Sequence, residues 1–275
     1  MLKIFHFYGI IIMSNYIYGG IFVEKVYVKI RENGEYHSPN FAQAVFGFKE
    51  LGAEIIKYKK IEEIYDIVED GDIVIDYIDQ TQAIFRKFGI DYSFDNYPEV
   101  LSEFLGRKIW KDKINNINSN PDKWNIFVKP IKEKAFTGKV IREPKDLIGC
   151  GSCYENYDVL CSDIVDIKRE WRCFYYYGDI IDIRPYKGDY HYHYDANVLD
   201  EMLKKINEWE DVPYAFCIDI GVTADGKTIL IECNDCYSLG SYGLYPLSYA
   251  KMIAARWAQL YKCGDDCYFG PIHNF

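Results

Sequence analysis

Polar and apolar residues alternate on both sides of Asp225-Gly226, within the stretch from Tyr214 to Leu244. Two alternating runs around such a dipeptide predict a β-hairpin with a two-residue loop. Counted back from that loop, Asp219 lies directly opposite Glu232, and Asn234 shares their face because side chains alternate along a strand. The opposite face is apolar and predicts a core, formed by Phe216, Ile218, Ile220, Ile229, Ile231 and Cys233.

This spacing brings two carboxylates and an amide oxygen together on one side of an otherwise apolar hairpin. Directly opposite residues have Cβ atoms about 5 Å apart, so the two carboxylates would repel each other if nothing lay between them. Hard oxygen ligands with room for water suit Mg²⁺, which proteins commonly share with substrate phosphates. The alternative is the solvated outer face of an antiparallel hairpin, which needs no ligand.

The first third of the chain alternates between strand-like and helix-like patterns, which predicts a small α/β layer domain. Ser38-Pro39 is a strong helix start, with serine as the N-cap and proline at the first helical position. The region contains neither a P-loop nor a G-x-G-x-x-G motif. We expect strands at residues 17–30, 54–58 and 72–76, and helices at 39–51, 61–68 and 80–88.

The middle of the chain predicts a helix at residues 99–105, a polar connector at 115–122 and a buried strand at 159–165. A short strand at Phe127–Pro130 carries Lys129, and the small residues of Lys134–Lys139 form a loop behind it. Backbone N–H groups of such a loop can bind phosphate oxygens. A lysine at a solvated strand end is the alternative interpretation.

Residues 170–177 and 180–184 predict a second hairpin around Gly178-Asp179. A three-residue loop would pair Arg172 directly with Arg184, whereas a two-residue loop would put them on opposite faces. Either arginine could instead form a surface ion pair that contributes little to stability. Beyond this hairpin we expect a helix at 195–209, a flexible loop at 238–243, and a helix at 246–261 that packs into the core through Tyr249, Ile253, Trp257 and Leu260.

Composition narrows the classes of partner. The chain has 275 residues, a formal net charge of -10 and 49% hydrophobic residues, so it can bury a sizeable core. The acidic balance argues against a nucleic-acid-binding protein with a wholly basic surface, and we expect no nucleic-acid partner.

The nine cysteines fit reduced thiols in a cytoplasmic protein, because several of them lie in apolar runs that predict buried strands. Zinc binding by Cys150-x-x-Cys153, by Cys233-x-x-Cys236 or by Cys263 and Cys267 with His273 is an alternative that rests on spacing alone. The pair His191 and His193 lacks a third ligand.

Residues 1–12 are apolar but too short to span a bilayer, and they lack a clear signal-peptide cleavage site. We expect either a buried first strand or a start upstream of the native Met13. No other segment predicts a membrane span, and we expect no membrane partner.

In the order in which these elements occur, the chain resembles the ATP-grasp family over about residues 95–262. Glu170-Trp-Arg172, the loop at 134–138 and the segment from Asn234 to Gly243 look most like the clade named for its two arginines and one lysine. The resemblance implies an α/β (α+β) architecture in which two subdomains clasp ATP. It places an N-terminal preATP-grasp-like domain at residues 1–94 and the ATP-grasp domain at 95–275, with a hinge near 159–166.

The resemblance also implies site residues. Lys129, Arg172 and Arg184 would face the phosphates or the acceptor, and Asp219, Glu232 and Asn234 would hold Mg²⁺, with Mn²⁺ as a substitute. An earlier family lysine is matched by either Lys108 or Lys111. The nucleotide contacts implied by the resemblance are Lys129, Phe136, Thr137, Gly138, Lys139, Ser162, Asp163, Ile164, Val165 and Glu170.

The implied activity is an ATP-dependent carboxylate–amine ligase that forms an amide or peptide bond through an acylphosphate. Its substrates would be small-molecule, peptide or protein carboxylates and amines, and the 238–243 loop would recognise the acceptor. A homodimer is compatible with the sequence. The alternatives are an ATP-grasp kinase that phosphorylates a small acceptor, or a nucleotide-binding interaction module without turnover.

Overall fold

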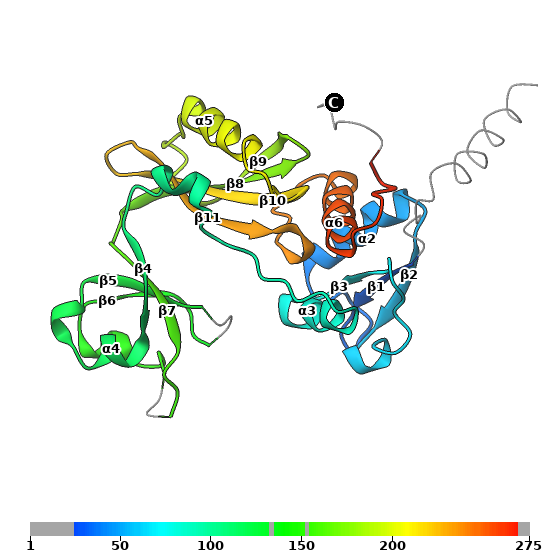
Figure 1. The fold of residues 1–275 in the computed structure, drawn as a ribbon, viewed down its shortest axis with the longest axis horizontal. Coiled ribbons are helices and arrows are strands. Elements are labelled where there is room, and N and C mark those ends of the chain that lie inside the picture. The colour runs from blue at the N-terminus through cyan, green and yellow to red at the C-terminus, as the bar shows by residue number, and fades with distance from the viewer. Residues whose placement is uncertain (1–24, 132–134, 152–153, 269–275) are drawn as a thin grey trace, which may run out of the picture.

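The computed structural model describes residues 25–131, 135–151 and 154–268. The expectations for residues 1–12, for the first part of the strand at 17–30 (residues 17–24), and for Lys134, Cys153 and His273 lie outside these ranges. Three sheets organise the described chain (Figure 1), with the N-terminal sheet at the right of the view, one four-stranded sheet at the lower left and the other above it.

The N-terminal sheet is parallel, in the order β2-β1-β3, with β1 at Lys25–Lys29, β2 at Glu54–Tyr58 and β3 at Ile73–Ile75. Helix α2 (Pro39–Glu50) begins at the predicted N-cap, where the Ser38 side chain accepts a hydrogen bond from the Asn40 backbone N–H. Helix α3 spans Ile78–Lys87. The predicted helix at 61–68 is wrong beyond its first turn, since only the 3₁₀ turn η1 (Ile61–Glu63) forms.

The second sheet is antiparallel, in the order β4-β7-β5-β6. A small apolar cluster that includes Val128 and Cys161 lies beneath it. The predicted polar connector at 115–122 is wrong, because most of it folds as α4 and η3. The bounds are β4 Ile109–Lys113, α4 Ile114–Asn118, η3 Pro121–Lys123, β5 Ile126–Pro130, β6 Lys139–Ile141, η4 Pro144–Leu147 and β7 Asp158–Ser162.

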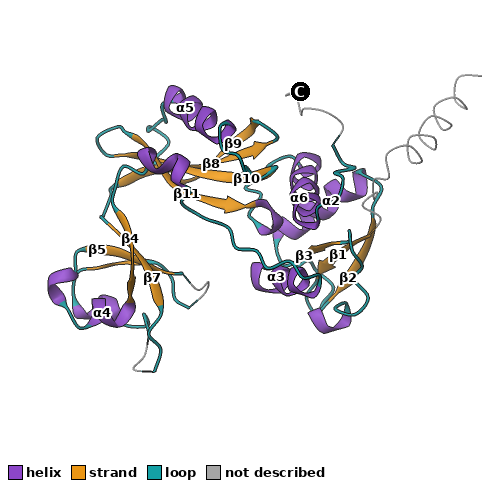
Figure 2. Ribbon diagram, viewed as in Figure 1, coloured by secondary structure: helices purple, strands orange, loops and turns teal. Residues whose placement is uncertain are grey.

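The third sheet is antiparallel, in the order β11-β10-β8-β9 (Figure 2). Helix α5 and the 3₁₀ helix η2 contribute to its core, which contains Phe216, Ile218 and Leu230. The expected helix at 99–105 is this 3₁₀ helix. The bounds are η2 Glu99–Phe104, β8 Ile167–Tyr176, β9 Asp179–Gly188, α5 Ala196–Asn207, β10 Ala215–Thr223, β11 Thr228–Asp235, η5 Cys236–Ser238 and α6 Pro246–Tyr261.

The β10–β11 hairpin pairs Asp219 directly with Glu232, as predicted, but its loop length and its regularity differ from the prediction. Its loop has three residues, because the Thr223 N–H donates to the Lys227 carbonyl and Gly226 adopts a φ of 84°. A β-bulge between Asp219 and Ile220 then restores the expected pairing. The prediction that Ile231 joins the core is wrong: Ile231 packs against Gly221 beside a cavity, and Leu230 takes its core position.

The β8–β9 hairpin also contains a β-bulge that changes the pairing of its strands. Its loop has two residues, Tyr177-Gly178, which alone would put Arg172 and Arg184 on opposite faces. A bulge between Phe174 and Tyr175 shifts the register by one residue, so the two arginines are direct partners. The prediction that a two-residue loop separates Arg172 from Arg184 was therefore wrong, because it assumed strands without a bulge.

The largest apolar cluster joins the N-terminal sheet and α2 to helix α6. It contains β1, α2 and β3 residues together with Tyr249, Ile253 and Trp257 of α6, which confirms the predicted core face of that helix. Helices α2 and α6 approach each other so closely that a Cβ on Gly47 of α2 would lie 2.0 Å from the carbonyl oxygen of Pro246 in α6. The domain boundary at 94/95 stays a prediction, and this cluster extends across it.

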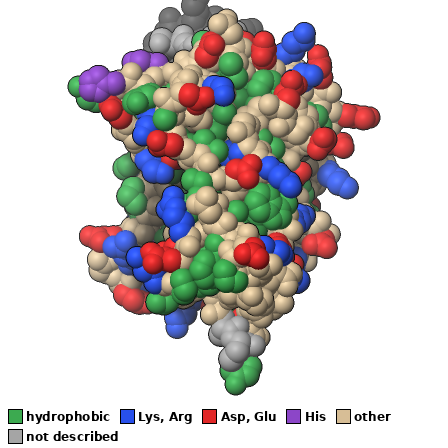
Figure 3. All heavy atoms as spheres, turned by 90° about the vertical axis from the view of Figure 1, so that its left-hand side faces the viewer, with side chains coloured by type: hydrophobic (Ala, Val, Ile, Leu, Met, Phe, Trp, Pro, Cys, Tyr) green, Lys and Arg blue, Asp and Glu red, His purple; other side chains and the backbone are tan. Residues whose placement is uncertain are grey.

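Within the described residues, no helix combines the length and the hydropathy needed to cross a membrane. The face in Figure 3 carries Lys and Arg interspersed with Asp and Glu, with apolar side chains between them, rather than one continuous basic area.

A buried ion pair joins β11 to α6. Arg256 donates from Nε and Nη2 to the two Asp235 oxygens, each at 2.8 Å, and both side chains are almost completely buried. We expect Arg256→Leu to lower the free energy of unfolding by about 3–5 kcal/mol, because it leaves a buried carboxylate without its partner. Urea denaturation measures this.

The control for that experiment is Lys145→Ala, which removes an exposed pair with Glu143 and should leave the urea midpoint nearly unchanged. Equal, small effects of both substitutions would contradict a structural role for the Asp235–Arg256 pair.

The hairpin loop has a measurable pH signature. Hydrogen bonds from Lys227 and Thr223 lower the pKa of Asp225 to about 2. Because this folded-state pKa is depressed, the stabilisation is present above the ordinary aspartate pKa and is lost as pH falls from about 4 towards 2. A carboxyl titration followed by NMR should give an apparent pKa near 2, and Lys227→Ala should move it towards about 4. An ordinary pKa in the unsubstituted chain would show that the loop contacts do not persist in solution.

Candidate functional site

A cavity of about 540 Å³ lies between the two four-stranded sheets. The two crossings between these sheets, residues 105–108 and 163–166, bond to each other: the Lys108 N–H donates to Asp163 Oδ2 at 3.0 Å, and the Asp163 N–H donates to the Lys108 carbonyl at 3.2 Å. The predicted site residues on the cavity wall are Lys129, Gly138, Ser162, Asp163, Ile164, Val165, Glu170 and Glu232.

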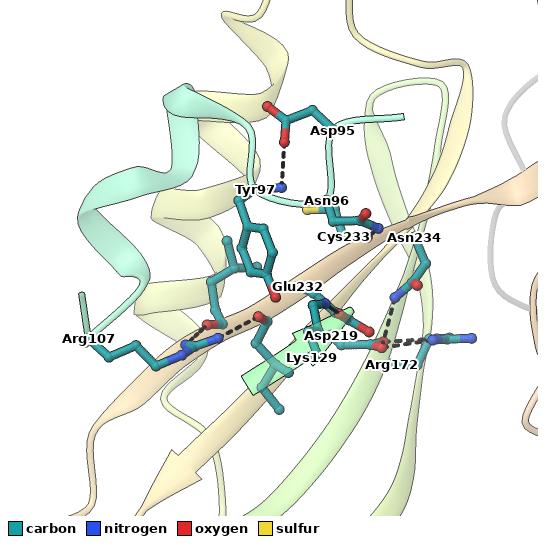
Figure 4. A network of polar contacts seen from close by, with 12 residues as sticks. Asp95, Asn96, Tyr97, Arg107, Lys129, Arg172, Asp219, Glu232, Cys233 and Asn234 are labelled. Atoms are coloured by element: carbon teal, nitrogen blue, oxygen red, sulfur yellow. Dashed lines mark hydrogen bonds and ion pairs between the residues drawn. The ribbon is translucent and has the colours of Figure 1, made fainter. Parts of the chain in front are cut away.

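Lys129 of β5 and Glu232 of β11 meet across the cavity. Lys129 Nζ lies 2.6 Å from Glu232 Oε2 and 4.9 Å from the centre of the Tyr97 ring (Figure 4). Burial alone would lower the pKa of Lys129, but Glu232 and Tyr97 together raise it. The ammonium group therefore stays positively charged between the two sheets.

Asp219, Arg172 and Asn234 form a second polar group beside the first (Figure 4). Arg172 Nε and Nη2 donate to the two Asp219 oxygens at 2.8 and 2.7 Å, and Asn234 Nδ2 donates to Asp219 Oδ2 at 3.0 Å. Burial would lower the pKa of Arg172, but the hydrogen bonds and charge of Asp219 raise it. Both oxygens of this nearly buried carboxylate accept hydrogen bonds.

A third charged pair, Lys187 and Glu170, also lines the cavity. Lys187 Nζ of β9 donates to Glu170 Oε1 of β8 at 2.6 Å. Glu170 is nearly buried, whereas the Lys187 side chain is well exposed. Sequence reasoning did not identify Lys187, because a bulge between Glu170 and Trp171 creates this pairing.

Arg107 is the main site residue that the sequence did not indicate. It lines the cavity, and it donates from Nη1 to the Leu230 carbonyl and from Nη2 to the Ile231 carbonyl, both at 2.7 Å. Burial lowers the pKa of Arg107. Neither Lys108 nor Lys111, the expected family lysine, lines the cavity. The available signal was an arginine next to a lysine, two residues before a strand.

Other predicted residues lie away from the cavity wall. Phe136 packs on the apolar cluster beneath the β4–β7 sheet, and Lys139 donates to the Ile148 carbonyl at 2.8 Å. Thr137 is exposed, and none of these three lines the cavity. Arg184 binds Asp182 at 2.6 Å and is also absent from the wall. The predicted residues Arg172, Asp219 and Asn234 lie beside the cavity residue Glu232 but do not line the cavity themselves.

The loop at 238–243, expected to be flexible, is tied to the N-terminal layer at several points. Ser238 Oγ donates to the Asp76 carbonyl at 2.8 Å, and the Ser241 N–H and hydroxyl both donate to Asn40 Oδ1. Gln43 Nε2 donates to the Leu244 carbonyl just beyond it. This loop therefore connects α2 to the ion-pair region.

The donor set fits a magnesium ion shared with phosphates. Asn234 turns its Nδ2 toward Asp219, so its Oδ1 is the oxygen left to serve a cation, and Asp219 and Glu232 add carboxylates. Within the described ranges, no group of three or more His, Cys, Asp or Glu residues could hold a metal by itself. The zinc alternatives thus gain no support there, and the eight described cysteines are free thiols.

A family model of an ATP-grasp domain matches residues 104–252, more than half of the chain. It describes family 2 of the clade named for its two arginines and one lysine. A search of curated proteins gives no match to the sequence.

Solved structures resemble the fold at low sequence identity. D-alanine–D-alanine ligase from Bacillus anthracis is 13% identical, with 86% of this chain and 98% of that chain covered and a TM-score of 0.53. L-amino acid ligase from Bacillus licheniformis is 8% identical, with 91% and 78% covered and a TM-score of 0.59. N5-carboxyaminoimidazole synthetase from Staphylococcus aureus is 10% identical, with 87% and 77% covered and a TM-score of 0.53.

At these identities the likeness shows the fold, which agrees with the expected ATP-grasp architecture. The family match covers the cavity residues from Arg107 to Glu232 and extends past Asn234. This chain therefore belongs to the ATP-grasp family, in family 2 of the clade named for two arginines and one lysine.

Proposed function

We propose that this protein is a magnesium-dependent, ATP-dependent carboxylate–amine ligase that forms an amide or peptide bond. The supporting observation is that Lys129 and Glu232 line a cavity between two sheets, while Arg172, Asp219 and Asn234 form a hydrogen-bonded group directly beside them, through the pairing of Asp219 with Glu232. Two cations and two carboxylates balance there, so a magnesium–nucleotide complex could exchange partners with them without leaving a buried charge unpaired.

The nucleotide would lie along the cavity wall. The crossing at Ser162–Val165 offers backbone groups to the base, and Glu170 offers a carboxylate to the ribose. Lys129 and the loop at 135–138 would meet the phosphates. The B. anthracis ligase was solved with ATP, and the S. aureus synthetase with ADP.

Asp219, Glu232 and Asn234 would hold Mg²⁺, or Mn²⁺ as a substitute. The bound ion would screen the phosphate charge and orient the terminal phosphate. A metal ion held there would compete with Lys129 for Glu232 and with Arg172 for Asp219, and would loosen both ion pairs. The two cations are then close to where the phosphate charge develops.

In the proposed reaction, a substrate carboxylate oxygen attacks the γ-phosphorus, and the bond to the β–γ bridging oxygen breaks to give ADP and an acylphosphate. An amine nitrogen then attacks the acyl carbon, phosphate leaves, and the nitrogen loses a proton. Lys129 and Arg172 stabilise the charge on the transferring group. Arg184 can join only after it leaves Asp182, so we assign it to the acceptor side.

Two solved neighbours are named for joining amino acids, and this supports an amino acid, peptide or protein carboxylate as the substrate class. We also propose a cytoplasmic location, in keeping with the free thiols of the described cysteines. Nucleic acid and membrane partners are not part of the proposal, and a homodimer is compatible with it.

The proposal predicts that pooled amino acids and short peptides stimulate ADP release in the presence of Mg²⁺, with products detected by mass spectrometry. Glu232→Gln should reduce ADP release by on the order of 100-fold or more, since even residues that only support metal ligands commonly change activity about 10- to 100-fold. Lys129→Met should raise the dissociation constant of Mg–AMPPNP measured by calorimetry, because it removes a phosphate-facing charge.

Lys227→Met, in the exposed hairpin loop, is the matched lysine control and should behave as the unsubstituted protein. ADP with a phosphorylated product and no amide would favour the kinase. Magnesium-dependent nucleotide binding without ADP from any pool would favour the interaction module.

A further inference from the structure

The segment Gly240–Gly243 covers the guanidinium of Arg172. The Gly240 carbonyl accepts a hydrogen bond from Arg172 Nη1 at 3.2 Å. The Tyr242 ring centre lies 4.7 Å from the Arg172 guanidinium carbon, within the range of a cation–π contact. Arg172 therefore has two sets of partners: the Asp219 carboxylate and this segment.

The backbone at Tyr242 is in a conformation that tyrosine rarely adopts. Its φ is 43°, in the left-handed region, which is unfavourable for a residue with a bulky side chain. The ring is nevertheless 47% exposed, so burial in a core does not account for the strain. Such strain persists only where the surroundings fix the conformation.

Contacts on both sides fix this conformation. Ser241 is bound to Asn40 of α2, and the Tyr242 ring stacks on Tyr186 of β9 at 4.9 Å with an interplanar angle of 19°. Tyr186 itself lines the cavity. The ring is thus held between a nucleotide-side tyrosine and the arginine of the second ion pair.

A metal ion at Asp219 would share the carboxylate with three hydrogen-bond donors that already contact it. The two Asp219 oxygens accept from Arg172 Nε and Nη2 and from Asn234 Nδ2. A cation there would repel the Arg172 guanidinium and compete with it for the charge of Asp219, which would weaken the Arg172 pair. The partners of Arg172 that do not depend on Asp219 are the Gly240 carbonyl and the Tyr242 ring.

We propose that Tyr242 is a positioning residue that keeps the Arg172 guanidinium in place when Asp219 turns to the metal. This rests on the proposed function, in which Asp219 is a metal ligand and Arg172 faces the phosphates. Tyr242 acts through its ring face, since the cation–π contact needs no hydroxyl. We therefore expect the Tyr242 ring to contribute to nucleotide binding when Mg²⁺ is present and not when it is absent.

Calorimetric binding of AMPPNP, in Mg²⁺ and in EDTA, tests this. Tyr242→Leu should weaken binding roughly three- to tenfold in Mg²⁺, the range of a partly desolvated cation–π contact. In EDTA the same variant should bind as the unsubstituted protein does, because Asp219 still holds Arg172. Tyr242→Phe should retain binding in both media.

Two further variants keep the result interpretable. Tyr242→Gly removes the ring and relieves the backbone strain, so it should fold and show the same magnesium-selective loss. Tyr190→Leu replaces another exposed tyrosine, which is 70% exposed, and should change neither measurement.

The proposal would be overturned if Tyr242→Leu weakened AMPPNP binding equally in Mg²⁺ and in EDTA. It would also be overturned if Tyr242→Phe bound AMPPNP as weakly as Tyr242→Leu does. Magnesium-selective loss in both Leu and Gly variants, with Phe unaffected, supports it. Absence of nucleotide binding by the unsubstituted protein would overturn the proposed function itself, and this inference with it.

Discussion

The site depends on one irregularity, the β-bulge that lies beside Ile231 in the β10–β11 hairpin. The hairpin loop has three residues, so a regular ladder would set Asp219 opposite Ile231 and turn Glu232 to the core face. The bulge inserts one residue and returns Glu232 to the cavity. Arg107 donates to the carbonyls of Leu230 and Ile231, on the outer side of edge strand β11, and so satisfies backbone groups at the irregular point.

Residues 95–107, which precede β4, also pair with the backbone of the edge strand β11. Asn96 exchanges two hydrogen bonds with Cys233: the Asn96 carbonyl accepts from the Cys233 N–H, and Asn96 Nδ2 donates to the Cys233 carbonyl. An exposed edge strand would otherwise offer free backbone groups to another chain. The 95–107 segment thus completes the sheet and brings Tyr97 and Arg107 to the cavity.

Features with a local physical cause could be predicted from the sequence. Ser38-Pro39 starts α2 because capping is decided within one turn, and the apolar stripe of α6 predicted its buried face. The bulges were not predictable, since Leu230 and Ile231 are both apolar and the hydrophobic pattern is unchanged by a one-residue slip. The Asp219–Glu232 pairing was right because two errors, in loop length and in regularity, cancelled. Arg107 and Lys187 were missed because their partners are distant in sequence and depend on those bulges.

The close packing of α2 on α6 has a practical consequence for work on fragments. The region recognised by the family model ends at residue 252, inside α6, and begins long after α2. Expression of that region alone would remove α2, whose Gly47 packs against Pro246. It would also end α6 before Trp257, which is part of the core that the two helices share. It would also free Ser241 from Asn40, so a truncated protein would have a 238–243 loop without its contacts to α2.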